Sequence, residues 1–87
     1  MKHFASQQFW KHYYSLPQKI QESADRCFAL LKFNHRHPSL HLKNTGHFWS
    51  VRIGIHWRAL AVESDNTLIW FWIGNHSEYD RIINSGK

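Results

Sequence analysis

Basic and imidazole side chains are concentrated in a part of the chain that has no acids. The whole chain of 87 residues carries six Asp and Glu, but none lies between Arg26 and Val62. The same stretch holds six of the eleven Lys and Arg residues and five of the eight His residues. Positive charge without competing carboxylates suits the binding of a polyanion, and imidazoles exchange protons near neutral pH. The pattern therefore favours a polyanion site over a basic surface that is merely solvated.

Two arginines on neighbouring expected strands sharpen this hypothesis. If residues 54–56 form a three-residue turn, Arg52 lies opposite Arg58 and Ile53 lies opposite Trp57. Two guanidinium groups side by side repel each other unless an anion lies between them. Two Arg side chains directed at one phosphate are a common way of binding it. A two-residue turn would place the two arginines on opposite faces, so this prediction depends on the turn length.

No metal or other cofactor is expected. His35, His37 and His41 fall within seven residues and have the nitrogen ligands that zinc accepts. Pro38 interrupts any regular geometry among them, and no carboxylate is close in the sequence. The single Cys27 excludes an internal disulfide and a zinc site built on cysteines.

The elements that must position these residues follow from the periodicity of apolar side chains. Residues 1–5 are expected to form an edge strand, and residues 6–15 and 17–33 two helices joined near Pro17. Residues 34–47 show neither period and are expected to form a long connection. The expected strands 49–53, 57–62 and 67–73 form an antiparallel meander. A last helix is expected over residues 77–84, with Tyr79, Ile82 and Ile83 facing inward.

The order β-α-α-β-β-β-α predicts an α+β fold. We expect a four-stranded, mainly antiparallel sheet with the N-terminal helical hairpin on one face. The other face would then be open to a ligand.

Length and composition limit the possible classes of protein. Eighty-seven residues allow one domain, spanning residues 1–87. With 43% hydrophobic and 16% aromatic residues, the chain is too apolar for intrinsic disorder. Its longest apolar run, residues 68–73, is too short to cross a membrane, and no apolar leader is visible, so we expect a cytoplasmic protein with no membrane partner. The net charge of +5 favours nucleic acid or an acidic protein as partner.

Several segments, in this order and at this spacing, match the pattern of a known family. They are Leu16-Pro17, Arg36-His37-Pro38-Ser39-Leu40-His41-Leu42-Lys43, Trp49-Ser50-Val51-Arg52-Ile53-Gly54, His56-Trp57-Arg58-Ala59-Leu60 and Gly74-Asn75-His76-Ser77-Glu78-Tyr79. Together with the expected order of elements, they resemble the RelE/ParE superfamily of bacterial type II toxins, in its RelE-like branch. The resemblance covers nearly the whole chain.

The resemblance implies a metal-independent, ribosome-dependent mRNA endoribonuclease. In such an enzyme the ribose 2′-OH attacks the adjacent phosphate and leaves a 2′,3′-cyclic phosphate. The implied partners are mRNA on the ribosome and a cognate antitoxin protein, with DNA contacted only through the bound antitoxin. A base near the 2′-OH, positive charge at the phosphate and an acid near the leaving oxygen are the groups required.

The resemblance also assigns candidate catalytic residues. Arg52 falls where the family has its phosphate-stabilising Arg, and Arg58 lies close on the next strand. His76 matches the His of the His-dependent subgroup, and Tyr79 lies near the C-terminal aromatic. His41 could share the acid–base work with His76, and which of them takes the proton is left open.

Three further residues are expected to bind RNA. Lys43 falls at the family's basic position after the long loop, and Arg36 and His37 precede it in the same segment.

Two alternatives to the nuclease remain open. Members that work through Lys and Arg keep a basic residue before the C-terminal Tyr, whereas this segment has only His76 and the acidic Glu78. That departure favours either a His mechanism or a lost activity. The alternatives are a ParE-like inhibitor of DNA gyrase and a catalytically inactive basic module that binds RNA or the ribosome. Only the nuclease requires Arg52, Arg58 and His76 to converge on one concave patch.

Overall fold

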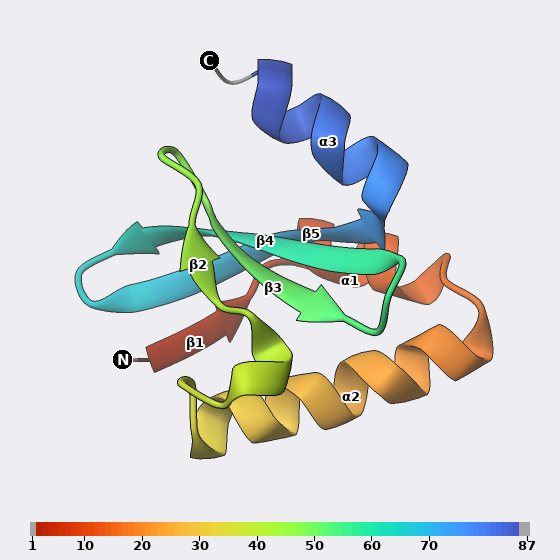
Figure 1. Ribbon diagram of the computed structural model, residues 1–87, viewed down its shortest axis with the longest axis horizontal. Coiled ribbons are helices and arrows are strands. Elements are labelled where there is room, and N and C mark those ends of the chain that lie inside the picture. The colour runs from red at the N-terminus through yellow and green to blue at the C-terminus, as the bar shows by residue number, and fades with distance from the viewer. Residues whose placement is uncertain (1, 86–87) are drawn as a thin grey trace.

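The computed structural model describes residues 2–85 as one sheet with helices on both of its faces (Figure 1). In chain order the elements are β1 (Lys2–Ala5), α1 (Gln7–Tyr14), α2 (Gln18–Phe33), the 3₁₀ turn η1 (Pro38–Leu40), β2 (Lys43–Asn44), β3 (Trp49–Ile53), β4 (Trp57–Ser64), β5 (Thr67–Asn75) and α3 (His76–Ser85). None of the helices within residues 2–85 has the length and apolar content needed to cross a bilayer.

The sheet confirms the predicted α+β class and the mainly antiparallel pairing. Its strand order is β1-β5-β4-β3-β2, in which β1 runs parallel to β5 and the other pairs are antiparallel. The sheet has five strands where four were expected, because Lys43–Asn44 pairs with β3 inside the segment predicted as a loop. Two residues are too few to show a period, so the sequence gives no sign of β2.

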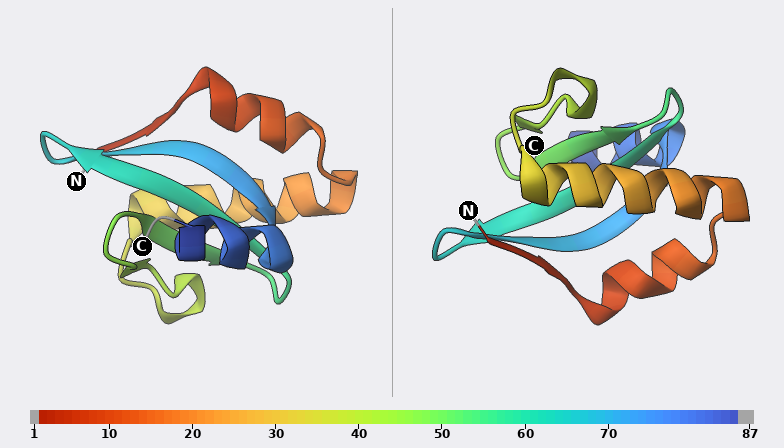
Figure 2. Two further views of the ribbon diagram at one scale, coloured as in Figure 1. Left: turned by 90° about the horizontal axis from the view of Figure 1, so that it is seen from above. Right: turned by 90° about the horizontal axis from the view of Figure 1, so that it is seen from below.

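The N-terminal helical hairpin covers one face of the sheet, as predicted (Figure 2). The Ser6 hydroxyl accepts a hydrogen bond of 3.2 Å from the backbone N–H of Phe9 and so caps the start of α1. Phe9 from α1 and Leu31 from α2 are both buried in one cluster with Trp70 of β5. This cluster is the main core, and it fixes which side of β3, β4 and β5 faces away from the hairpin.

The opposite face is only partly open. Helix α3 packs on it through Tyr79, with Ile82 and Ile83 alongside, against Leu60 and Trp72 of the sheet (Figure 1). The predicted inward residues of this helix are thereby confirmed. The expectation that this whole face is open holds only for the part beside α3.

A bulge in β5 lets adjacent side chains serve both cores. Leu60 pairs with Trp72 while Ala61 pairs with Trp70, so Phe71 is the extra residue. Trp70 belongs to the main core, whereas Phe71 and Trp72 both pack in the cluster beneath α3. An inserted residue breaks the alternation of a strand in this way. The bulge therefore gives α3 two aromatic rings to pack on.

Gly74 is required by the packing of this second cluster. A Cβ atom at this position would collide with the indole of Trp72, which is 5% exposed. We predict that Gly74→Ala lowers the free energy of unfolding by about 1–3 kcal/mol, because the ring has no free space to move into. Urea denaturation of the purified protein measures this. In a Trp72→Phe background the smaller ring leaves room, so the loss should shrink; an equal loss in both backgrounds would contradict the steric explanation.

The edge strand β1 is fastened to the core by a histidine. Nδ1 of His3 accepts a hydrogen bond of 3.1 Å from the indole N–H of Trp70, and the two rings stack with centroids 6.2 Å apart. Burial lowers the pKa of His3, and nearby positive groups lower it further. The neutral imidazole is the form that can accept this bond.

The lowered pKa of His3 predicts a loss of stability in mild acid. The unfolded chain binds a proton at His3 near the ordinary pKa of 6.5, and the folded chain does so only at lower pH. The stabilisation is therefore complete above pH 6.5 and is lost as the pH falls through the folded pKa. Urea denaturation between pH 7.5 and pH 5 should show a weaker decline in His3→Asn than in the wild type. His47→Asn, on an exposed loop, controls for the loss of an imidazole; an unchanged decline in His3→Asn would refute the prediction.

Candidate functional site

The pairing of β3 with β4 brings the two arginines side by side. Arg52 lies opposite Arg58, and Ile53 opposite Trp57, so the turn has the three residues that were predicted. Gly54 in this turn has φ +64°, a conformation that favours glycine. Because Ile53 lies in the main core, the arginines project from the other face of the sheet, beside α3.

A small basic hollow lies between the two arginines. Its volume is about 100 Å³, and it is lined by His41, Lys43, Ser50, Arg52 and Arg58. The volume exceeds the roughly 30 Å³ share of one water several-fold, which is room for a phosphate group. No carboxylate is among these lining residues. Four of the predicted site residues therefore meet in one place with no negative charge to neutralise them.

Backbone carbonyl groups of the turn hold the guanidinium groups in position. Nε of Arg52 donates to the carbonyl oxygen of Gly54 at 2.9 Å. Nη1 of Arg58 donates to the carbonyl oxygens of Trp57 at 2.8 Å and Ile55 at 3.3 Å. A guanidinium has five N–H groups, so each Arg keeps donors for a ligand. These hydrogen bonds hold the two half-buried guanidinium groups in position, so the arginines lose little side-chain entropy when a ligand binds.

His41 reaches the hollow from the loop between α2 and β2. It follows η1 with φ +47°, in the left-handed region that residues other than glycine rarely adopt. Leu40 beside it is completely buried, which anchors this turn to the main core. Nε2 of His41 lies 3.5 Å from Nη1 of Arg52. The strained backbone therefore places an imidazole at the rim of the anion site.

Tyr79 lies beneath the site and is almost inaccessible. It is 4% exposed, and its hydroxyl donates to Oγ of Ser50 at 3.3 Å. Its ring centroid lies 5.9 Å from the guanidinium carbon of Arg58, within the range of a cation–π contact. Tyr79 therefore acts on the hollow through Arg58 and Ser50 rather than by direct contact with a ligand.

His76 stands next to the hollow but does not line it. It opens α3, and its backbone N–H donates to the carbonyl oxygen of His56 at 2.7 Å. Its Nδ1 lies 3.4 Å from Oδ2 of Asp80, and its ring centroid is 6.1 Å from that of Tyr79. Of the three residues that should converge, Arg52 and Arg58 line the hollow, whereas His76 lies beside Tyr79 and does not line it.

Two predicted RNA-binding residues lie apart from the hollow. Arg36 and His37 are on the loop before η1 and do not line it. Nδ1 of His37 accepts from the backbone N–H of Ser39 at 3.2 Å, so His37 caps η1. Within residues 2–85, no three His, Cys, Asp or Glu side chains come together as metal ligands would.

Ser50 lines the hollow although it was not predicted to. In the sequence it alternates with Trp49 and Val51 and looks like an ordinary solvent-facing strand residue. In the structure it is 1% exposed, because β2 and α3 cover it. Its burial depends on β2, which the sequence did not reveal.

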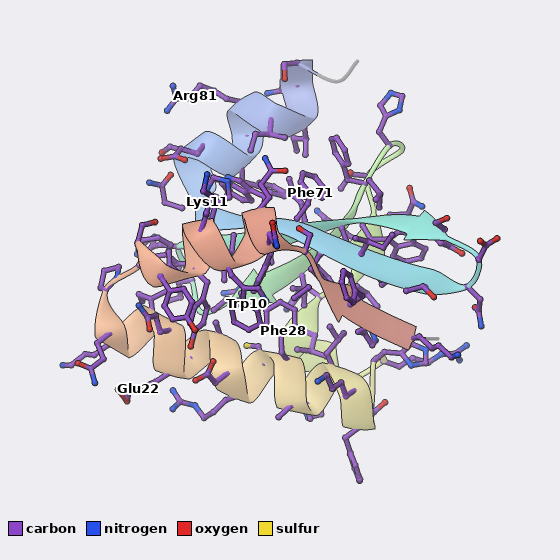
Figure 3. All side chains as sticks on the ribbon, turned by 180° about the vertical axis from the view of Figure 1, so that it is seen from behind. Trp10, Lys11, Glu22, Phe28, Phe71 and Arg81 are labelled. Carbon is purple, nitrogen blue, oxygen red and sulfur yellow. The ribbon has the colours of Figure 1, made fainter. Side chains whose placement is uncertain are left out.

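A second hollow, of about 280 Å³, lies on the helical side of the molecule. It is lined by residues of β1, α1 and α2, among them Trp10 and Phe28 (Figure 3), and by Trp70 of β5. Its lining is mostly apolar, and the hydroxyl of Tyr13 donates to Oδ1 of Asp25 at 2.7 Å on one side of it. That bond raises the pKa of Tyr13 to about 12, and burial adds to the shift. This hollow shares no residue with the basic one.

Comparison with known proteins identifies the family and the fold of this chain. The family of ParE-like toxin domains matches residues 18–81, which is more than half of the chain. The chain belongs to this family. The toxin domain thus includes α2, all the residues that line the basic hollow, and most of α3. No curated protein sequence matches the chain.

Solved structures show the same fold for the toxin domain. YafQ from Escherichia coli BL21(DE3) superposes with a TM-score of 0.64 at 18% identity, over 90% of this chain and 96% of YafQ. The Methanococcus jannaschii RelB–RelE antitoxin–toxin complex gives 0.65 at 19% identity, over 90% and 96%. Isolated E. coli RelE gives 0.62 at 10% identity, over 99% and 98%. The predicted membership of the RelE/ParE toxin superfamily is confirmed.

The paired arginines predict a specific response to phosphate. At matched ionic strength, 10 mM phosphate in place of chloride should raise the Tm of the wild type by roughly 8 °C if its Kd is about 1 mM. Arg52→Gln should lose this rise. In chloride buffer Arg52→Gln should be no less stable than the wild type, because one of two repelling charges is gone. Differential scanning calorimetry measures both effects.

Arg26→Gln is the matched control for this measurement. Arg26 is exposed on α2 and does not line the hollow. It should keep the full phosphate effect. Equal stabilisation of Arg52→Gln and the wild type would show that phosphate binds elsewhere.

Proposed function

We propose that this domain is the toxin of a toxin–antitoxin pair and cleaves mRNA on the ribosome without a metal ion. The observation that carries the proposal is the acid-free hollow, in which Arg52 and Arg58 pair across two strands with His41 at the rim. Two guanidinium groups held side by side repel each other unless an anion lies between them, so the pair calls for an anionic ligand. A single RNA phosphate meets that requirement.

The proposed chemistry is an in-line attack within the RNA. The 2′-oxygen bonds to the adjacent phosphorus, the bond from phosphorus to the 5′-oxygen breaks, and a 2′,3′-cyclic phosphate remains. Negative charge builds up on the phosphate oxygens in the transition state. Arg52 and Arg58 would donate to those oxygens, with Lys43 adding charge from β2, and such fixed donors lower the barrier most when water is excluded.

Two imidazoles are available for the proton transfers. His41 stands at the rim beside Arg52, and His76 lies beside Tyr79 with its Nδ1 3.4 Å from Oδ2 of Asp80. One would accept the proton of the 2′-OH, and the other would give a proton to the leaving 5′-oxygen. Such transfers contribute about 10²- to 10⁴-fold each. RNA would have to reach both His41, which lines the hollow, and His76, which does not.

A cognate antitoxin is the proposed protein partner. One similar structure is an antitoxin–toxin complex, RelB–RelE from M. jannaschii. The net charge of +5 and the acid-free hollow favour an antitoxin with an acidic segment, which would cover the hollow and block RNA. Any contact with DNA would pass through that antitoxin.

Inhibition of DNA gyrase is the second candidate. The matching family is described as ParE-like, which keeps open the inhibition of gyrase that the sequence resemblance also implies. That activity makes no use of paired arginines and an imidazole around a hollow, so the geometry favours the nuclease. A basic module that binds RNA or the ribosome without cutting is the third outcome.

Mapping of mRNA 5′ ends in a translating extract tests the nuclease. The wild type should produce new ends within translated codons. Arg52→Gln should slow their appearance roughly 10²- to 10³-fold, the cost of removing one donor to a transition-state oxyanion. His41→Asn and His76→Asn should each slow it at least about 10²-fold. Arg26→Gln should cut at the wild-type rate.

Each of the other possible results supports a different site or a different function. Undiminished cutting by Arg52→Gln would place the nuclease site elsewhere. An uncut message would contradict the nuclease, and a supercoiling assay with purified gyrase would then test the second candidate. Binding to RNA or ribosomes with neither activity would leave the inactive module.

A further inference from the structure

Apart from the aromatic residues, Ser50 is the only buried residue with a polar side chain within residues 2–85. It is 1% exposed, and it forms part of the wall of the basic hollow. It lies on β3 with Lys43 opposite it on β2 and Leu60 opposite it on β4. It therefore sits on the face of the sheet that carries the arginines, two residues before Arg52.

The Ser50 hydroxyl has hydrogen-bonding capacity that its partner among residues 2–85 does not use. A hydroxyl can donate one hydrogen bond and accept two. The only bond that its side chain makes to another of residues 2–85 is the one it accepts from the hydroxyl of Tyr79, at 3.3 Å. Its own proton has no acceptor there. A buried donor without an acceptor is unfavourable, and the hollow is the space toward which this proton can turn.

We propose that the Ser50 hydroxyl donates to an oxygen of the anion that binds between Arg52 and Arg58. The hollow then offers a neutral donor beside its charged ones, which helps to orient a phosphate and not merely to attract it. This inference rests on the proposed anion site, but not on the cleavage of RNA.

Tyr79 is the positioning residue in this arrangement. By donating to Oγ of Ser50, its hydroxyl occupies a lone pair there and leaves the Ser50 proton free to turn toward the hollow. Its ring lies against the guanidinium group of Arg58. One side chain on α3 therefore sets both the neutral donor and one of the charged donors. Tyr79 does not touch the ligand itself, which agrees with its burial.

Affinity for a 2′-deoxy trinucleotide tests the role of Ser50. This probe carries phosphates but cannot be cut by 2′-OH attack, so binding is measured apart from catalysis. In an NMR titration, Ser50→Ala should raise the Kd roughly five- to tenfold, the cost of one hydrogen bond. Ser50→Thr keeps the hydroxyl and should bind within about twofold of the wild type. Ser64→Ala, the matched control on the exposed end of β4, should bind like the wild type.

A second pair of variants separates a direct donor from a mere partner of Tyr79. If Ser50 only satisfied the tyrosine hydroxyl, Ser50→Ala would cost nothing once Tyr79→Phe had removed that hydroxyl. We expect Ser50→Ala to weaken binding in the Tyr79→Phe background as well. Should the alanine variants unfold, Ser50→Cys keeps the side-chain size with a weak donor and should show the same loss.

The outcomes distinguish this inference from the proposed function. Wild-type binding that Ser50→Ala leaves unchanged would overturn the role of Ser50 alone. No binding by the wild type, or binding that Arg52→Gln leaves unchanged, would overturn the anion site and this inference with it. Loss of binding in Ser50→Ala that Ser50→Thr restores would establish the donor even if no message were ever cut.

Discussion

The register between β3 and β4 is the constraint on which the molecule depends. Side chains alternate along a strand, so a slip of one residue would exchange the two faces. In the observed register Ile53 and Ala59 enter the main core, and Arg52 and Arg58 leave by the other face. Burial of the apolar set against α1 and α2 thus fixes the position of the charged set. The fold tolerates repulsion between two cations because the same pairing secures its core.

On the face of the sheet opposite the α1–α2 hairpin, one part packs against α3 and another part forms the basic hollow. Helix α3 covers Leu60 and Trp72, whereas the neighbouring part of the same face, beside Arg58, stays uncovered and forms the hollow. Tyr79 stands at the boundary, with its ring in the packed cluster and its hydroxyl on Ser50. Packing of α3 and geometry of the hollow are therefore not independent properties. A substitution that loosened the packing of α3 would therefore also disturb the hydrogen-bond donors of the hollow, even without contacting them.

Much of the fold could be predicted from the sequence, because strong periods and turn residues are local signals. The helices before residue 34, the long strands and the three-residue turn at Gly54 were all visible, and with them the pairing of Arg52 with Arg58. The two-residue strand β2 and the bulge at Phe71 were not, since two residues show no period and one inserted residue leaves no mark in a strand that is apolar on both faces. Ser50 was missed because its burial involves β2 and α3, which its own neighbours in β3 do not reveal.

The parallel pairing of β1 with β5 has a consequence for the order of assembly. The first strand to be synthesised pairs with the last one, with Lys2 opposite Thr67 and Ala5 opposite Trp70. Contacts this far apart in sequence form late, because a long loop must close first. Trp70 also completes the main core, and α3 follows it in the chain. A nascent chain therefore lacks the finished sheet that supports the arginine face until β5 has emerged.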